Sequence, residues 1–112
     1  MKQIKAKIGD ILRLNYVNSK HDPKPMIVYM ATVLAQNGHR IISGFNLNYV
    51  RSLKEQNSLI EYVRKYSNAL EAYKSIKVNH PKWIKSFRTY IQTDVKTAYR
   101  LNDKNFKLEK LR

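Results

Sequence analysis

The sequence contains no cysteine, which excludes disulfide bridges and thiolate metal ligands and is compatible with a reducing compartment. Glycine is also scarce, and the three glycines lie too far apart to form a phosphate-binding loop or a dinucleotide fingerprint. No run of about 18 apolar residues is present, so no membrane-spanning helix is expected. The basic start, residues 1–7, precedes neither a long apolar segment nor a small-residue cleavage site. That pattern predicts a protein that is not secreted.

Acidic side chains are few. The 112 residues include 8 Asp and Glu against 22 Lys and Arg, which gives a formal net charge of +14. Both halves are basic: residues 1–50 hold seven cations and two anions (+5), and residues 51–112 hold fifteen and six (+9). The hydrophobic content of 43%, with eight tyrosines, is too high for a disordered basic tail and predicts a core. A domain this basic attracts polyanions, so we expect nucleic acid as the first partner and an acidic protein surface as the second.

The first half of the chain has the patterns of β-strands. Polar and apolar residues alternate over 12–17, an almost unbroken apolar run covers 26–35, and an Asn-Gly turn signal leads into a strand over 40–50. The segment between the first two strands contains two prolines and has the composition of a loop. Gly44 interrupts the third strand and predicts a bulge or a sharp bend.

The second half has helical periodicity. Ser-x-x-Glu capping boxes at Ser52 and Ser58 predict that a helix begins at one of these serines, and apolar residues then recur at helical spacing through Ile76. A second helix is expected over 81–98, with proline at its first position and a broad apolar stripe. A short C-terminal element over 106–111 could be of either type.

Strands followed by helices are the order of the α+β class. We therefore expect an SH3-like β-barrel or a bent meander over residues 1–50, and two or three helices over 51–112 that pack on it. At 112 residues the two parts fit one compact domain.

The sequence offers few groups for catalysis. Its histidines, His21, His39 and His80, fall in three separate predicted loops, and no second ligand stands at metal-binding spacing. Acidic residues are scattered singly, so no carboxylate pair can be inferred. We therefore expect a protein that is not an enzyme and that uses no metal, no cofactor and no small-molecule substrate, and we expect no membrane partner.

Cations gather on one side of the second predicted helix, and no glutamate at i±4 relieves their mutual repulsion. Solvated helices usually mix charges of both signs, so we predict that this face contacts phosphate or an acidic partner. A plain solvated face is the alternative. With two arginines near the β-domain, the predicted binding residues are Lys82, Lys85, Arg88, Lys96, Arg40 and Arg51.

Aromatic residues at helical spacing are expected in the core. The tyrosines of the predicted strands, Tyr16, Tyr29 and Tyr49, are open to either role. An exposed aromatic side chain on a barrel face can stack on a nucleic-acid base.

Two segments of the first half carry a recognisable pattern. Residues 9–12 read Gly-Asp-Ile-Leu, and residues 24–28 read Lys-Pro-Met-Ile-Val after a loop. This resembles the start of the MazF/PemK-type endoribonuclease toxins, in which a Gly-Asp-Ile strand precedes an Arg-Pro-apolar strand. Lys24 stands where that family usually has arginine, and the family's later strand with Ser or Thr is not found. The resemblance implies an SH3-like barrel, with endoribonuclease activity as a third, less favoured function.

A longer pattern combines residues 14–16 (Leu-Asn-Tyr), the Asp22-x-x-Pro25 loop with its following apolar strand, residues 44–51 (Gly-Phe-Asn-Leu-Asn-Tyr-Val-Arg) and residues 98–100 (Ala-Tyr-Arg). It is similar to small virion-associated proteins of large tailed bacteriophages, of the type that protects DNA ends. Asn48 replaces the histidine that is commoner there, and this chain is shorter than typical members. The resemblance implies binding to the ends of a packaged genome.

The favoured function is a non-enzymatic basic binding protein of bacteriophage type, located in the virion or the host cytoplasm, whose Lys and Arg contact a nucleic-acid backbone. DNA is the favoured nucleic acid, although no module in the sequence recognises one sugar. The alternative is a structural adaptor subunit of a virion, in the head, neck, tail or baseplate. Such an adaptor would dock on acidic protein surfaces of the larger assembly.

Overall fold

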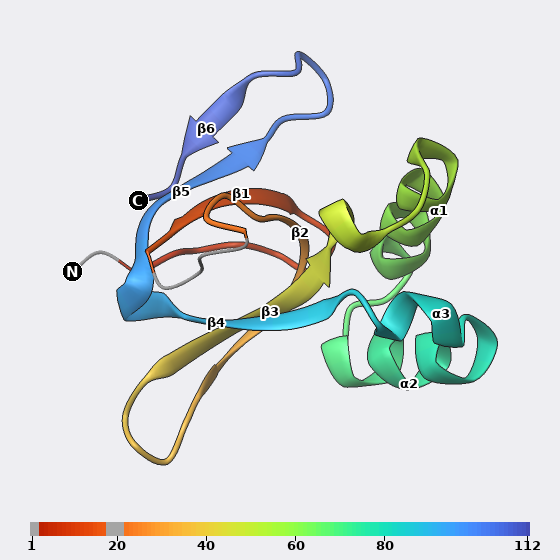
Figure 1. Cartoon of the computed structure of the whole chain (residues 1–112), viewed down its shortest axis with the longest axis horizontal. Coiled ribbons are helices and arrows are strands. Elements are labelled where there is room, and N and C mark those ends of the chain that lie inside the picture. The colour runs from red at the N-terminus through yellow and green to blue at the C-terminus, as the bar shows by residue number, and fades with distance from the viewer. Residues whose placement is uncertain (1–2, 18–21) are drawn as a thin grey trace.

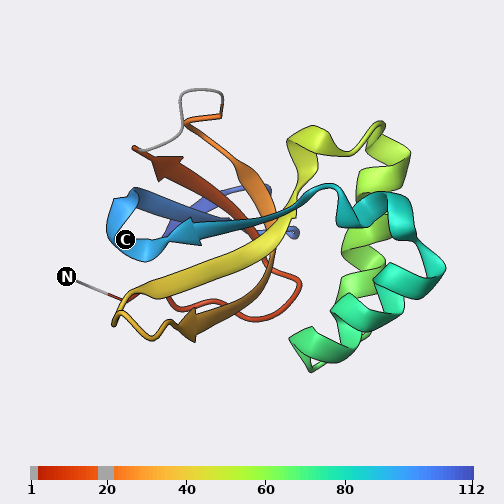
Figure 2. The ribbon, with the colours of Figure 1, turned by 60° about the horizontal axis from the view of Figure 1, so that its bottom comes forward.

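A single antiparallel sheet of six strands, in the order β4-β3-β2-β1-β5-β6, dominates the computed structural model, which describes residues 3–17 and 22–112. The sheet is strongly curled, and the helices lie together at one end of it (Figures 1 and 2). The class is α+β, as the sequence predicts, but the sheet is not closed into a barrel. The strands are β1 Ile11–Tyr16, β2 Met26–Leu34, β3 Arg40–Asn46, β4 Phe87–Ile91, β5 Val95–Leu101 and β6 Leu108–Lys110.

Two prolines fix the beginning of β2. The backbone N–H groups of Tyr16 and Leu14 donate to the carbonyl oxygens of Pro23 (2.8 Å) and Pro25 (3.0 Å). Proline has no N–H with which to return these bonds, so the regular strand begins only after the second proline. The last residues of the predicted loop, 22–25, therefore run beside β1 without forming a regular strand. Residues 18–21 of that loop, His21 among them, lie outside the described residues.

β2 and β3 form the predicted hairpin, and their pairing shifts opposite Gly44. Gly44 pairs with Tyr29, and the next pair is offset by one residue, which leaves Met30 as the extra residue of a bulge in β2. A Cβ atom at Gly44 would lie 2.6 Å from the carbonyl oxygen of Val28. The predicted irregularity is present, but the extra residue belongs to the partner strand.

Two helices replace the one that periodicity predicts up to Ile76. Helix α1, Leu53–Arg64, begins at the first of the candidate serines, because the Ser52 hydroxyl accepts a hydrogen bond from the backbone N–H three residues later (3.2 Å). Helix α2, Ala69–Asn79, begins in the same way at Asn68 (3.1 Å). The cap at Asn68 competes with helical continuation, so the prediction of an unbroken helix is wrong.

The second predicted helix, over 81–98, is wrong for most of its length. Helix α3 is confined to Pro81–Ile84, and β4 and β5 follow it, joined by a 3-10 turn over Gln92–Asp94. β4 pairs along β3, and β5 pairs along β1. The apolar residues of this segment fit helical spacing, but their β-branched and aromatic side chains also suit a sheet, and strand pairing decides between the two. The C-terminal part of the chain is therefore mostly sheet.

Both faces of the curled sheet carry apolar residues. The core on the inner face contains Leu12, Leu14, Ile27, Ile42 and Tyr90 among others. The core on the outer face is formed by residues of the sheet with α1, α2 and a second 3-10 turn, Leu47–Tyr49. The helices cover one end of the outer face, and the rest of that face carries polar side chains together with exposed apolar ones such as Leu108.

Gly44→Ala should destabilise the fold, because its Cβ would press on the carbonyl oxygen of Val28 in a strand held by neighbours on both sides. We expect the free energy of unfolding to fall by about 1–3 kcal/mol in urea denaturation. The control is Asn57→Ala, at an exposed position of α1, where we expect a change below about 0.5 kcal/mol. Equal stabilities of Gly44→Ala and the wild-type chain would contradict the close packing of β2 on β3.

Candidate nucleic-acid interface

A tyrosine flanked by two cations lies on the open part of the outer sheet face. Directly paired residues of an antiparallel sheet point to the same face. Arg13 of β1 pairs with Tyr99 of β5, and Tyr99 pairs on its other side with Lys110 of β6. Glu109, next to Lys110, belongs to the opposite face, where its Oε2 lies 2.5 Å from Nη2 of Arg100. The row therefore carries two positive charges and no carboxylate.

A second row lies beside the first. Asn15 of β1 pairs with Thr97 of β5. The hydrogen bonds from β1 to the two prolines continue the register and bring Lys24 opposite Asn15. This row adds an ammonium, an amide and a hydroxyl to the same face.

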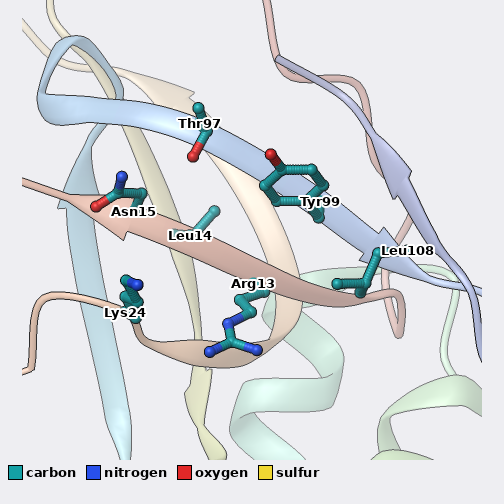
Figure 3. Close-up of a pocket in the computed structure, with 7 residues that line it drawn as sticks. All are labelled: Arg13, Leu14, Asn15, Lys24, Thr97, Tyr99 and Leu108. Carbon is teal, nitrogen blue, oxygen red and sulfur yellow. The ribbon is translucent and has the colours of Figure 1, made fainter.

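The two rows form a concavity of about 310 Å³, which we call the β1–β5 concavity. In Figure 3, Arg13 and Lys24 lie on one side of β1, and Thr97 and Tyr99 lie on the other. Neither cation has an ion pair within residues 3–17 and 22–112. A concave surface that holds two such cations and no carboxylate attracts anions. Its lining residues are Arg13, Leu14, Asn15, Lys24, Thr97, Tyr99 and Leu108.

Asp22, the carboxylate nearest to Lys24 in sequence, is engaged in hydrogen bonds elsewhere. The amide of Asn46, which is buried, donates to Oδ2 of Asp22 (2.6 Å). The same Asn46 accepts a hydrogen bond from the backbone N–H of Asn48 (2.9 Å), and the Asn48 amide donates to Asp22 as well (3.4 Å). These bonds fasten the Asp22-x-x-Pro25 loop to the Asn-Leu-Asn segment. Two separate parts of the bacteriophage-like sequence pattern thus meet in the fold.

A second basic surface surrounds Tyr49, whose side chain is 51% exposed. The guanidinium carbon of Arg88 lies 4.7 Å from the centre of the Tyr49 ring. Arg88 also donates to the carbonyl oxygens of Lys85 (2.6 Å) and Phe87 (2.8 Å). Arg88 is therefore held in place by the backbone, with its charge on an exposed aromatic ring.

The four cations predicted on one helix face, Lys82, Lys85, Arg88 and Lys96, do not share such a face, because the predicted helix over 81–98 is confined to Pro81–Ile84. Lys96 is the extra residue of a bulge in β5, next to Thr97. Arg40 begins β3, at the hairpin end of that strand. The other four predicted cations form what we call the Tyr49 surface. Arg51 and Lys82 line a cavity with Tyr49 and Glu55, Arg88 lies over the Tyr49 ring, and the Lys85 carbonyl oxygen accepts a hydrogen bond from Arg88. These four are Arg51, Lys82, Lys85 and Arg88.

The sequence prediction omits the β1–β5 concavity. The alternation in the first strand does place Arg13 and Asn15 on one polar face. A helix over 81–98, however, leaves Tyr99 without a strand, so its pairing with Arg13 cannot be inferred. The available signal was the β-forming character of residues 95–99, Val-Lys-Thr-Ala-Tyr.

Several of the other aromatic side chains, together with His80, are part of the packing. Tyr29 and Tyr90 are buried, and Tyr16 packs edge to face on Tyr90 with ring centres 5.3 Å apart. His80 stacks on Trp83 at 4.1 Å. Within the described part of the chain, no three His, Asp or Glu are grouped to hold a metal ion, and no helix is long and apolar enough to cross a bilayer.

No protein-family model, curated protein or solved structure matches this chain. The resemblances to bacteriophage virion proteins and to the MazF/PemK toxins therefore stay predictions from short segments. The inference of function rests on the surfaces described above.

Alkaline pH should weaken the fold through Tyr90, because burial raises the pKa of this side chain to about 12. A tyrosine in the unfolded chain ionises near pH 10, so the unfolded state loses this proton first. The contribution of Tyr90 to stability should be complete below about pH 10 and lost as the pH rises through about 12. The expected full loss is about 3 kcal/mol, because the two pKa values differ by about two units and one unit corresponds to about 1.4 kcal/mol.

The measurement is urea denaturation of the wild-type chain and of Tyr90→Phe at about pH 9 and about pH 11.5. The variant has no phenol to ionise at this position, so its free energy of unfolding should fall less over the same interval. Parallel losses in the two proteins would show that the environment of Tyr90 is not as described.

Proposed function

We propose that the protein is a non-enzymatic nucleic-acid-binding protein that contacts the phosphate backbone through lysine and arginine side chains. The observation that carries this proposal is the lining of the β1–β5 concavity, with Arg13 and Lys24 and no carboxylate. A phosphate that enters the concavity meets two cations without ion pairs in the described part of the chain. The proposal includes a bacteriophage context with DNA as the favoured ligand.

The distribution of carboxylates adds to the argument. Asp10 and Glu109 both contact Arg100, at 3.4 Å and 2.5 Å. Asp103 contacts Arg64 at 2.6 Å. Because these acidic groups are engaged with cations of their own, they do little to neutralise the cations of the concavity. The positive field at that surface follows from this arrangement and from the net charge of +14.

The proposed mechanism is electrostatic. Each phosphate that meets a cation releases condensed counterions, which favours binding at low salt irrespective of base sequence. The concavity and the Tyr49 surface are joined by the segment over 22–25, since Lys24 lines the first and Asp22 is bonded to residues that adjoin the second. A backbone that crosses this segment would meet Lys24 on the side of the concavity and Arg88 on the side of Tyr49, where the Asp22 carboxylate is also present.

Arg13→Gln and Lys24→Gln, alone and combined, should weaken binding of a labelled oligonucleotide in fluorescence anisotropy. Each substitution removes one phosphate contact, so the slope of log K against log salt should become shallower by about 0.7–0.9 per substitution. The titrations would span about 50–200 mM salt. Affinity should fall in the variants most strongly at the low end of that range.

The matched controls are Lys74→Gln and Lys77→Gln, which make the same change of charge at exposed positions of α2. They should leave the salt slope almost unchanged. The proposal is wrong if the wild-type chain binds no nucleic acid at about 50 mM salt, or if the controls lower the slope as much as the substitutions in the concavity.

The second candidate function, a structural adaptor in a larger assembly, is favoured by one observation. An apolar groove lies between the β2–β3 hairpin and α2, with Met30, Tyr73 and Phe87 in its lining. Val33 and Leu70, also in this lining, are 56% and 61% exposed. Such a groove suits an apolar segment of a protein partner whose acidic surface faces the cations. A chain that fails to bind nucleic acid in the titration above but binds an acidic subunit of the assembly would be an adaptor.

A further inference from the structure

We infer that the β1–β5 concavity takes single-stranded nucleic acid, with one base stacked on Tyr99 and the neighbouring phosphates on the cations around it. The inference rests on the proposed function and adds the class of ligand, a single strand and not a duplex. The contribution of Tyr99 distinguishes it from general attraction between a basic protein and a polyanion.

The placement of Tyr99 carries the first step. Its side chain is partly exposed and lies between those of Arg13 and Lys110, each directly opposite on a neighbouring strand. Directly opposed side chains have Cβ atoms about 4.5–5.5 Å apart. An aromatic ring with a cation on either side matches the repeat of a nucleic-acid strand, in which each base lies between two phosphates. This combination of stacking platform and basic groove is typical of proteins that bind single strands.

The shape of the site carries the second step. Tyr99 lies in a concavity whose other walls include Lys24 and Leu108. In a duplex the bases are stacked on each other and expose only their edges in the grooves, so no base face can reach this ring. A single strand can turn one base outward and lay its face on the tyrosine.

The remaining lining residues suit a base better than they suit a bare phosphate. Leu108 is 48% exposed and offers an apolar surface at the edge of the concavity. Asn15 and Thr97 offer an amide and a hydroxyl, which can bond to a base edge or a sugar. A site for phosphate alone would need the cations but neither the ring nor the leucine.

Electrostatics by itself would favour the duplex, because a double strand has the higher charge density and the steeper salt dependence. A measured preference for single strands would therefore be evidence that a base stacks on Tyr99. The experiment compares a labelled oligothymidylate of about 10 nucleotides, an oligouridylate and a duplex of equal length by fluorescence anisotropy. The first two ligands separate DNA from RNA as the source of the strand.

The wild-type chain should bind the single strands more tightly than the duplex, and this comparison needs no variant. Tyr99→Leu should weaken single-strand binding by about tenfold, with little effect on the duplex and an unchanged salt slope, because stacking releases no counterions. Tyr99→Phe keeps the ring and should retain single-strand affinity. Circular dichroism of both variants verifies folding.

Two results would overturn the inference. One is a wild-type chain that binds duplex as tightly as single strands. The other is a folded Tyr99→Leu whose single-strand affinity is unchanged while Arg13→Gln still weakens binding of both ligands. Either result is compatible with binding to the phosphate backbone but disproves the preference for single-stranded nucleic acid. Failure of the wild-type chain to bind any of the three ligands at low salt would instead remove the proposed function itself.

Discussion

β1 and β5 exchange backbone hydrogen bonds from the pair Leu12–Arg100 to the pair Asn15–Thr97. In the sequence, the strands β2, β3 and β4 and all the helices lie between β1 and β5. This pairing places β5 and β6 beside β1 and so adds their side chains to both faces of the curled sheet. It buries Leu12 and Leu14 with Ala98 on the inner face. On the outer face it aligns Arg13 with Tyr99. The inner core and the candidate site are therefore two consequences of one register.

The register also decides which charges reach solvent. A shift by one residue would turn every side chain of β5 to the other face. Tyr99 would then leave the outer face, and Arg100 would lose its contacts with Asp10 and Glu109. In the observed register a hydrogen bond to Glu109 is the main cause that raises the pKa of Arg100. The cations of the concavity stay without such partners in the described part of the chain.

The hydrogen-bond network around Asp22 fixes the loop that carries Lys24 of the site. Asn46 is buried, and its amide and carbonyl groups bond to Asp22 and to the backbone of Asn48. A buried amide without partners would cost about 1–3 kcal/mol, so the network strongly favours this loop position. Because Lys24 is two residues from Asp22, the same bonds limit where Lys24 can lie.

The sequence predicts the parts of the fold that depend on local signals. The alternation over 12–17, the Asn-Gly turn and the capping boxes at Ser52 and Ser58 each predict an element by themselves. All three elements are present, and the helix begins at Ser52. The helix over 81–98 is wrong because its apolar residues fit a helical period, and only the distant strands β1 and β3 select the extended form.

The candidate site depends on distant pairing in the same way. The polar face of β1, with Arg13 and Asn15, can be inferred from the sequence alone. The position of Tyr99 beside it requires the pairing of β1 with β5. The Tyr49 surface is an intermediate case, because three of its cations, Lys82, Lys85 and Arg88, belong to the predicted helix over 81–98, of which only Pro81–Ile84 is helical.

The most direct test is a titration of the isotopically labelled protein with an oligothymidylate, followed by NMR of its backbone amides. The account predicts that the largest shifts fall on Arg13 and Asn15 of β1 and on Thr97 and Tyr99 of β5, with small shifts in α2. Shifts confined to α2 and the β2–β3 hairpin, or no shifts at low salt, would contradict it.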